Sequence, residues 1–338
     1  MKAIFLVRNG SAATAFETRE MPMPIVGAGQ VLIKVEAFGL NFADVMARRG
    51  MYKEAPPIPC VLGYDVAGIV TQTGPEVHHV KTGDRVTAMT RFGGYAEYVL
   101  TAASGVAAIP ASIAMPAATA LATQYCTAYY AAAEMVNLHE GDKVLIHAGA
   151  GGVGTALIQF AKFKGCEIFS TAGSEEKLAY LKASGVHHPI NYQTSNFESE
   201  IKKITSGEGV DVIFDAVGGQ SVLRGFRSLQ AGGRIICYGA AAITNRNIFG
   251  KIKTGIGFGL YHPIMFMVSS KSMLGLNMLK IADHKPERIQ ACLKEVIQLT
   301  DRGVFNPLPP TVFSAKEIAV AHEYLENRKS VGKVALYW

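Results

Sequence analysis

Three glycines with the spacing G-x-G-x-x-G, at Gly149, Gly151 and Gly154, separate an apolar run from an amphipathic one. The run before them, VLIHA (144–148), has the composition of a buried strand, and the residues after them have helical spacing. Glycines in such a turn let a diphosphate approach the main chain, and the free N–H groups of the first helical turn would hold it. The alternative is a glycine-rich turn that serves packing alone. We expect a dinucleotide-binding turn.

The end of the next expected strand, EIFSTA (167–172), bears on which dinucleotide binds. An NAD site places a carboxylate there, but the tip of this strand is Gly173. Ser174 suits a helix N-cap, so Lys177 would occupy the third helical position, where a cation opposes the helix dipole at a cost of about a few tenths of a kcal/mol. A 2′-phosphate would offset that cost. Glu175 keeps NAD open, and a plain surface lysine is the remaining alternative; we expect NADPH.

The elements that must position this turn fall into two regions, which differ in their pattern of apolar and turn-forming residues. Up to residue 123, short extended runs separated by Gly, Pro and Asp indicate a β-rich domain. From 124 to 279, apolar strands alternate with helical patterns, which predicts an α/β, doubly wound parallel sheet covered on both faces. From 280 to 338 we expect one helix and then β-like pieces that return to the first domain. The expected strands of the central region are 144–148, 167–172, 211–217, 234–240 and 272–278.

The composition and charge argue against a nucleic-acid-binding or membrane-binding arm. The chain has 338 residues, is 49% hydrophobic and 18% charged, and carries a net charge of +6. Its Lys and Arg residues are scattered, so a nucleic-acid or membrane-binding arm is not expected. The positive surplus suits an anionic small molecule or solubility alone.

Cysteine spacing and hydropathy point to the cytoplasm. None of the five cysteines forms a C-x-x-C pair, which favours buried free thiols in a reducing compartment. The apolar run at the N-terminus is too short for a signal peptide. The apolar segment 254–270 is broken by Gly, His and Pro and is shorter than a bilayer span, so we expect no transmembrane segment.

Several ordered segments carry a resemblance to a known family: 39–52, 63–77, 82–86, 93–99, 127–130, 147–154 and 331–337. In this combination they resemble the medium-chain dehydrogenase/reductase superfamily, in particular the zinc-independent quinone oxidoreductases and the subgroup with the vesicle amine transport protein homologues. The resemblance covers essentially the whole chain and implies a GroES-like catalytic domain beside a Rossmann domain.

The resemblance also shows what this sequence lacks. The alcohol dehydrogenase branch carries a Cys where Asn41 or Phe42 stands and a His-Glu pair where this chain has Tyr64 and Asp65. It also carries a four-cysteine lobe that is missing here. Without thiolate and imidazole ligands at these positions, no catalytic zinc is expected. For Asp65 we expect a hydrogen-bonding or packing role.

The resemblance implies that Asn41 and Tyr52 line a cleft that holds the nicotinamide and the acceptor. Asn41 would bond the carboxamide or the substrate oxygen, although it also suits the N-cap of the helix that follows. Tyr52 would donate a proton or close the pocket, with a place in the core as the alternative. Tyr64 is expected to border the same cleft.

The family pattern also implies the cofactor contacts. Thr127 is expected near the nicotinamide, and Lys333 is matched by position, with a solvated strand residue as its alternative. Asp215, at the carboxyl end of a strand, is expected to organise the edge of the sheet. The remaining contacts are Gly151, Gly152, Val153 and Gly154 at the diphosphate, Gly173, Ser174, Lys177 and Tyr192 at the 2′-phosphate, and Gly239, Ala240, Leu276 and Asn277 at the nicotinamide ribose and ring.

A metal-free site of this kind suits acceptors that need no Lewis acid. Reduction makes a quinone aromatic, so close placement of the nicotinamide is the main catalytic requirement. We therefore predict an NADPH-dependent quinone reductase. The alternatives are an enone or enal reductase, in which hydride goes to the β-carbon, and a low-turnover NADPH-binding protein that acts through partners.

The aromatic and Met-rich segment 258–273, which overlaps the apolar run 254–270, has three possible roles. It could line a substrate mouth, form a subunit interface or touch a lipid surface. The family usually dimerises through the sixth strand, so we expect this segment to form a subunit interface and the protein to be a homodimer.

Overall fold

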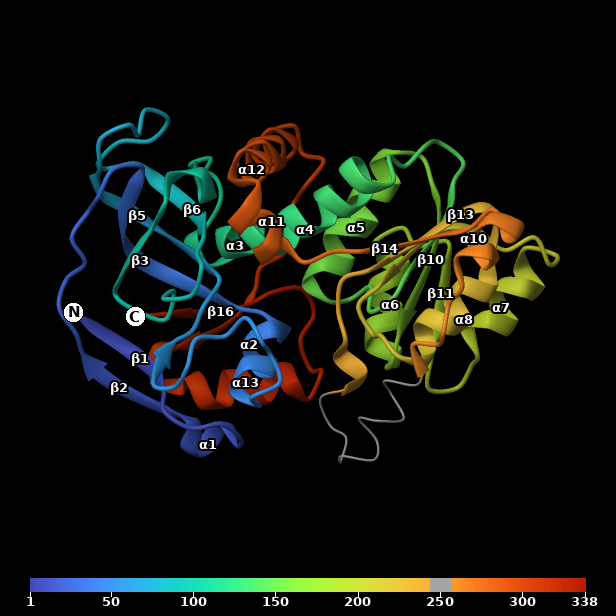
Figure 1. Cartoon of the computed structure of the whole chain (residues 1–338), viewed down its shortest axis with the longest axis horizontal. Coiled ribbons are helices and arrows are strands. Elements are labelled where there is room, and N and C mark those ends of the chain that lie inside the picture. The colour runs from blue at the N-terminus through green and yellow to red at the C-terminus, as the bar shows by residue number, and fades with distance from the viewer. Residues whose placement is uncertain (244–256) are drawn as a thin grey trace. The chain divides into compact units, whose positions relative to one another are not determined.

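The computed structural model describes residues 1–243 and 257–338 of the chain. The chain divides into two compact units, of which the first comprises residues 1–127 and 278–338 and the second comprises residues 128–277 (Figure 1). The sequence placed these divisions at 123/124 and 279/280.

The first unit is built on a seven-stranded sheet in which β3 pairs with β5, β7 and β16. β16 pairs antiparallel with β3, so the C-terminal segment does return to the first domain, as predicted (Figure 1). The strands are β1 (Lys2–Leu6), β2 (Phe16–Glu20), β3 (Gln30–Leu40), β4 (Cys60–Val61), β5 (Asp65–Thr73), β6 (Arg85–Met89), β7 (Tyr98–Ala102), β8 (Val106–Ala108), β15 (Thr311–Ser314) and β16 (Val334–Tyr337). The helices are α1 (Ala12–Ala15), α2 (Phe42–Arg48), η1 (Ala103–Gly105), α3 (Met115–Ala120), η2 (Leu121–Tyr125), α11 (Met278–His284), α12 (Pro286–Asp301), η5 (Ala315–Glu317) and α13 (Ile318–Glu326); α4 (Cys126–Tyr129) spans the division.

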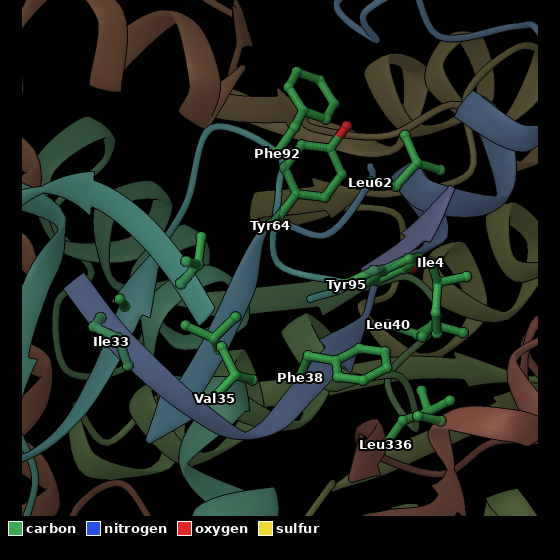
Figure 2. Packing of buried hydrophobic residues seen from close by; sticks show 14 of the residues in the cluster. Ile4, Ile33, Val35, Phe38, Leu40, Leu62, Tyr64, Phe92, Tyr95 and Leu336 are labelled. Atoms are coloured by element: carbon green, nitrogen blue, oxygen red, sulfur yellow. The ribbon is translucent and has the colours of Figure 1, made fainter. Parts of the chain in front are cut away.

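The core of the first unit follows the period of its longest strand. Along β3 the core residues are Val31, Ile33 and Val35 and then Phe38 and Leu40. The pairing of β3 with β5 shifts register between Val35 and Ala37. Because of this shift, odd-numbered residues face the core before it and even-numbered residues face the core after it. The two halves of β3 therefore turn different residue positions toward one continuous core (Figure 2).

One prediction for the C-terminal region was wrong. The helix expected after residue 280 is present as α12, but α11 and α13 also form there. α13 begins after a capping box in which Ser314 and Glu317 bond each other's backbone N–H groups. Its Glu326 forms an ion pair with the buried Arg48 of α2. A long-range contact of this kind leaves no periodic signal in the sequence.

The second unit has the predicted α/β architecture. Its six strands pair in parallel in the order β11-β10-β9-β12-β13-β14, which is the 3-2-1-4-5-6 order of a doubly wound dinucleotide-binding sheet. The strands are β9 (Lys143–Ile146), β10 (Glu167–Ala172), β11 (His188–Asn191), β12 (Val210–Asp215), β13 (Leu229–Cys237) and β14 (Ser272–Gly275). The helices are η3 (Tyr130–Met135), α5 (Gly152–Phe163), α6 (Glu175–Ala183), α7 (Phe197–Ile204), α8 (Gln220–Ser228), η4 (Ala241–Ile243) and α10 (Pro263–Ser269).

Helices cover this sheet and bury its apolar strands. Phe197 of α7 and Phe226 of α8 join one core cluster with Leu145, Phe169 and Ile213 of the strands. In Figure 1, α7 and α8 lie together on one side of the sheet, and α5 and α6 lie on the other. In the part of the chain that the structure describes, no helix is both long and apolar enough to cross a membrane.

Candidate active-site residues in each unit

The turn after β9 has no room for side chains at its glycines. A Cβ on Gly149 would lie 1.9 Å from Oγ of Ser170, and a Cβ on Gly154 would lie 2.5 Å from the carbonyl oxygen of Ala148. Both distances are below what real Cβ atoms show, so the main chain approaches its neighbours here more closely than any other residue type allows. The close approach of helix to strand is the packing that the third glycine of this motif permits.

The start of α5 presents backbone donors that have no acceptor within the helix. Gly151 is the N-cap residue and, being glycine, has no side chain to accept a hydrogen bond. The N–H groups of Gly152, Val153 and Gly154 occupy the first three helical positions, where no intrahelical acceptor exists. These donors, with the positive end of the helix dipole, fit a diphosphate.

A second polar group lies at the carboxyl end of β10. Ser174 is the N-cap of α6 and its Oγ accepts the N–H of Lys177 at 3.3 Å, so Lys177 holds the third helical position as expected. The N–H of Tyr192 donates to the carbonyl oxygen of Ala172 at 3.1 Å. A Cβ on Gly173 would lie 2.3 Å from the Tyr192 hydroxyl oxygen, so the phenol lies against this glycine. The structure thus brings the four expected 2′-phosphate residues together.

Glu175, the carboxylate that kept NAD open, is hydrogen-bonded to another side chain. Oε1 of Glu175 accepts a hydrogen bond from Nδ2 of Asn191 at 3.0 Å. That bond joins the first turn of α6 to the end of β11, which gives Glu175 a structural role next to Ser174.

One buried carboxylate orders the turn that follows β12. Oδ1 of Asp215 accepts the N–H groups of Val217 and Gly218, both at 2.7 Å, and Oδ2 accepts the Ser221 hydroxyl at 2.6 Å. Asp215 therefore organises the sheet edge as expected, because three donors fix the turn into α8.

The expected ribose and ring contacts lie at the same edge of the sheet. A Cβ on Gly239 would lie 2.6 Å from the carbonyl oxygen of Ala216, so Gly239 and the following Ala240 pass close to the turn after β12. The N–H of Leu276 donates to the carbonyl oxygen of Cys237 at 2.9 Å, which places Leu276 and the exposed Asn277 directly beyond β13 and β14.

The apolar segment of the second unit is partly described. Residues 254–256 of the expected segment 254–270 lie outside the described residues. Phe258, Tyr261 and Phe266 pack against the core of the second unit. α10 leaves Met267 and Val268 80% and 83% exposed, which is high for apolar side chains. The homodimer stays a prediction.

In the first unit, three polar side chains form a buried group. Nζ of Lys333 donates to Oδ2 of Asp65 at 2.7 Å and to Oδ1 of Asn41 at 3.0 Å. Nδ2 of Asn41 donates to the same Asp65 oxygen at 2.9 Å. Lys333 is 2% exposed, so the alternative of a solvated strand residue was wrong. Gly39 makes space for the pair, since a Cβ there would lie 2.3 Å from Cε of Lys333.

Asn41 is held from several sides. It stands at the N-cap of α2, but its amide bonds Asp65 and Lys333, and Nε2 of Gln124 approaches its Oδ1 at 3.4 Å. Oδ2 of Asp44 accepts the backbone N–H of Asn41 at 2.8 Å. Burial raises the pKa of Asp44 to about 7, with the nearby Asp65 adding to the shift.

Two tyrosines and a phenylalanine form an aromatic group in the same unit. Tyr64 lies between Tyr52 and Phe92, with ring centroids 6.1 Å and 5.1 Å away (Figure 2 shows Tyr64 beside Phe92). Tyr64 is buried, and within the described residues its hydroxyl has no hydrogen-bond partner. Burial raises the pKa of both tyrosines, so each keeps its proton at neutral pH and can donate it in a hydrogen bond.

Thr127 is buried at the end of the first unit. Its hydroxyl donates to the carbonyl oxygen of Thr123 at 2.6 Å, one helical turn earlier. Because that bond uses the proton of Thr127, its oxygen remains available as an acceptor.

Comparisons with known proteins place both units in one family. Residues 27–111 match the model of the alcohol dehydrogenase GroES-like domain, and residues 152–295 match that of the zinc-binding dehydrogenases. The human synaptic vesicle membrane protein VAT-1 homolog is 33% identical over 332 residues, which cover 97% of this chain and 84% of that protein. The chain belongs to the medium-chain dehydrogenases/reductases, in their zinc-independent quinone oxidoreductase and VAT-1-like branch.

Solved structures of other proteins share the whole fold. An Escherichia coli quinone oxidoreductase complexed with NADPH is 26% identical with a TM-score of 0.88, and the match covers 100% of both chains. The CurK enoyl reductase is 28% identical with a TM-score of 0.86, and the match covers 99% of both chains.

The zinc named in the second family model does not fit this medium-chain dehydrogenase/reductase. Zinc takes thiolate, imidazole and carboxylate donors, whereas the corresponding positions hold the amide of Asn41, the phenol of Tyr64 and a carboxylate that is bonded to the ammonium of Lys333. No group of three His, Cys, Asp or Glu side chains among the described residues could hold a metal ion.

Sequence reasoning missed two residues of the buried polar group, Asp44 of α2 and Gln124 of η2, which both bond Asn41. The hydrogen-bonding role expected for Asp65 is present, since its carboxylate accepts from Lys333, the residue before β16. The one available signal was the position of Asp44, three residues after Asn41, which is the spacing of a capping box.

Proposed function

We propose that this medium-chain dehydrogenase/reductase transfers a hydride from NADPH to a quinone-type acceptor without a metal. The observation that carries the proposal is the buried pairing of Lys333 with Asp65 and Asn41. A cation already neutralises the carboxylate at the position where the zinc branch binds its metal, so this chain suits acceptors that need no Lewis acid. A quinone is such an acceptor, because its reduction product is aromatic.

The second unit is proposed to hold the cofactor, which supplies the hydride when bound. The N–H groups of Gly152, Val153 and Gly154 would hold the diphosphate, and Gly151 leaves the approach open. Ser174, Lys177 and Tyr192, with Gly173 beneath the phenol, would hold the 2′-phosphate. An NADPH complex of a relative with the same fold supports this assignment.

Six further residues complete the proposed cofactor site. Their parts in binding rest on the family pattern and on where the structure places them. They are Thr127 near the nicotinamide, Lys333 beside Asn41, and Gly239, Ala240, Leu276 and Asn277 at the ribose and ring.

The first unit is proposed to bind the acceptor. Negative charge builds on the acceptor oxygen as hydride arrives, and a hydrogen-bond donor stabilises it. The hydroxyl of Tyr64 has no partner among the described residues, and the half-buried Tyr52 lies beside it. Asn41 donates one amide hydrogen to Asp65 and retains a second for the carboxamide or the acceptor.

Reduction of an enone or enal is the second candidate, and the likeness to the CurK enoyl reductase favours it. Hydride would then go to the β-carbon, and the same tyrosines would stabilise the enolate oxygen. A third outcome is tight NADPH binding with little turnover, in line with relatives named as vesicle membrane proteins.

NADPH oxidation with a panel of quinones and enones, each compared with NADH, tests the proposal. We expect quinones to be reduced fastest and NADPH to be preferred. Faster turnover of enones would replace the first candidate by the second. Tight binding of NADPH without oxidation by either acceptor class would establish the third.

Two variants test the expected preference for NADPH over NADH. Lys177→Ala should raise the KM for NADPH about ten- to a hundredfold, the worth of one hydrogen bond to a charged group, and leave the KM for NADH unchanged. Lys182→Ala, in the last turn of the same helix, is the matched control and should change neither. Equal effects of Lys177→Ala on both cofactors would contradict the 2′-phosphate site.

A further inference from the structure

Tyr52 lies on a loop that has little backbone support. Residues 51–59, between α2 and β4, form neither helix nor strand. The main-chain bonds of this loop are local: the N–H of Met51 donates to Met46, and that of Ala55 donates to Tyr52. Side chains must therefore fix the position of the Tyr52 ring relative to Tyr64.

A group of ion pairs joins this loop to two other segments of the first unit. Oε1 of Glu54, two residues after Tyr52, lies 3.2 Å from Nζ of Lys280 on α11. Oε2 of Glu54 lies 3.8 Å from Arg91, which follows β6. Nε of Arg91 lies 2.8 Å from Oδ1 of Asp283 on α11. The two carboxylates are 20% and 23% exposed, whereas Arg91 and Lys280 are 48% and 52% exposed, so these ion pairs are shielded from water on their acidic side only.

Arg91 connects these ion pairs to the aromatic group. Its guanidinium carbon lies 5.7 Å from the ring centroid of Phe92, and Phe92 packs against Tyr64 (Figure 2). Burial raises the pKa of Tyr52, and the positive charge of Arg91 opposes that rise. Arg91 thus contacts Asp283 on α11, Glu54 in the loop and the ring of Phe92. Phe92 in turn packs against Tyr64.

We propose that Arg91 is a positioning residue that holds the loop 51–59, and with it Tyr52, in place for the acceptor through Glu54 and Asp283. The proposal rests on the proposed function, in which Tyr52 acts on the acceptor. Arg suits this position because its planar group reaches two carboxylates at once, which the ammonium of a lysine does less well.

The test compares three variants of the full chain. Arg91→Met removes the ion pairs and keeps an apolar stem over Phe92, and Arg91→Lys keeps the charge. Arg227→Met is the matched control, since Arg227 forms an ion pair with Glu198 in the second unit in which the arginine is 55% exposed, comparable to the 48% of Arg91. The measurements are kcat/KM for the acceptor at saturating NADPH, the KM for NADPH, and hydrogen–deuterium exchange of the loop 51–59.

Arg91→Met should lower kcat/KM for the acceptor about three- to thirtyfold, from the loss of two partly shielded ion pairs, with the KM for NADPH within about twofold. Exchange of the loop should rise, Arg91→Lys should recover part of the rate, and Arg227→Met should match the wild type. Salt at about 1 M should lower the wild-type rate toward that of Arg91→Met, because such pairs are screened.

Two results would overturn the proposal: faster loop exchange in Arg91→Met with unchanged acceptor kinetics, or equal losses for the acceptor and for NADPH. The failure of the proposed function looks different. If the wild type reduces no acceptor, or if Tyr52→Phe leaves the kinetics unchanged, Tyr52 has no such role. The exchange measurement alone then decides whether Arg91 holds the loop.

Discussion

Replacing Asp44 by asparagine should change how the stability of the first unit depends on pH. Asp44 is fully buried in α2, and burial raises the pKa of its carboxyl from 3.8 to about 7. Backbone hydrogen bonds from Asn41 and Gly63 oppose that rise, as does the charge of Lys333, whereas Asp65 adds to it. Burial is the largest of these effects, so the net shift of the pKa is upward.

The sign and size of the effect follow from the two pKa values. Between 3.8 and about 7, the folded state keeps a proton on Asp44 that the unfolded state has released. The free energy of unfolding therefore falls as pH rises through this window, by about 1.4 kcal/mol per pH unit. From about pH 5 to about pH 8 this amounts to roughly 3 kcal/mol, which asparagine, having no proton to lose, should abolish.

The assay is denaturant unfolding followed by the fluorescence of Trp338, the only tryptophan of the chain. Trp338 belongs to the first unit and lies 5.8 Å from Phe38 between ring centroids, so it reports on the unit that contains Asp44. The stability of Asp44→Asn relative to wild type should rise by about 3 kcal/mol between about pH 5 and about pH 8. Any fixed cost of the new amide cancels in this difference. A difference that is the same at every pH would refute the burial argument.

Three further predictions concern burial and assembly. Lys333→Met should cost about 3–5 kcal/mol of stability in unfolding experiments by leaving the buried carboxylate of Asp65 unpaired, and Lys333→Met with Asp65→Asn should recover most of that loss. Burial raises the pKa of Cys237 to about 12 and the other four cysteines are buried, so native thiols should be alkylated slowly at neutral pH and all five rapidly in denaturant; fast alkylation of the native protein would contradict this. Light scattering should give a homodimer that becomes monomeric in the variant Met267→Glu with Val268→Glu, and an unchanged mass would rule out α10 as the interface.

The second unit could be predicted well because its signals are local. Its strands are apolar throughout, and each expected strand of the central region overlaps an observed one. The role of Ser174 follows from residue type and spacing, and the structure confirms it as the N-cap of α6. Gly149 and Gly154, which have no room for a Cβ, could be picked out by their spacing in the G-x-G-x-x-G motif.

In the first unit, the partners of several polar and charged side chains could not be predicted from the sequence. The sequence leaves Lys333 open between a cofactor contact and a solvated strand residue, and only the pairing of β16 with β3 brings its ammonium to Asp65, 268 positions away. Gln124 and Arg91 have no periodic or motif signal, since their partners come from distant segments. Buried polar groups of this kind are fixed by tertiary contacts, which a single sequence does not display.

Hydride transfer from NADPH without a metal is tested most directly by deuterium at C4 of the nicotinamide. The protein is first treated with a chelator and its zinc content measured, and single-turnover oxidation is then followed with each C4-deuterated stereoisomer of NADPH. We predict that one stereoisomer slows the reaction, that the other does not, and that the zinc-free protein keeps its full rate. Equal rates for both stereoisomers and unlabelled NADPH, or activity that is lost with the chelator and restored by zinc, would contradict this account.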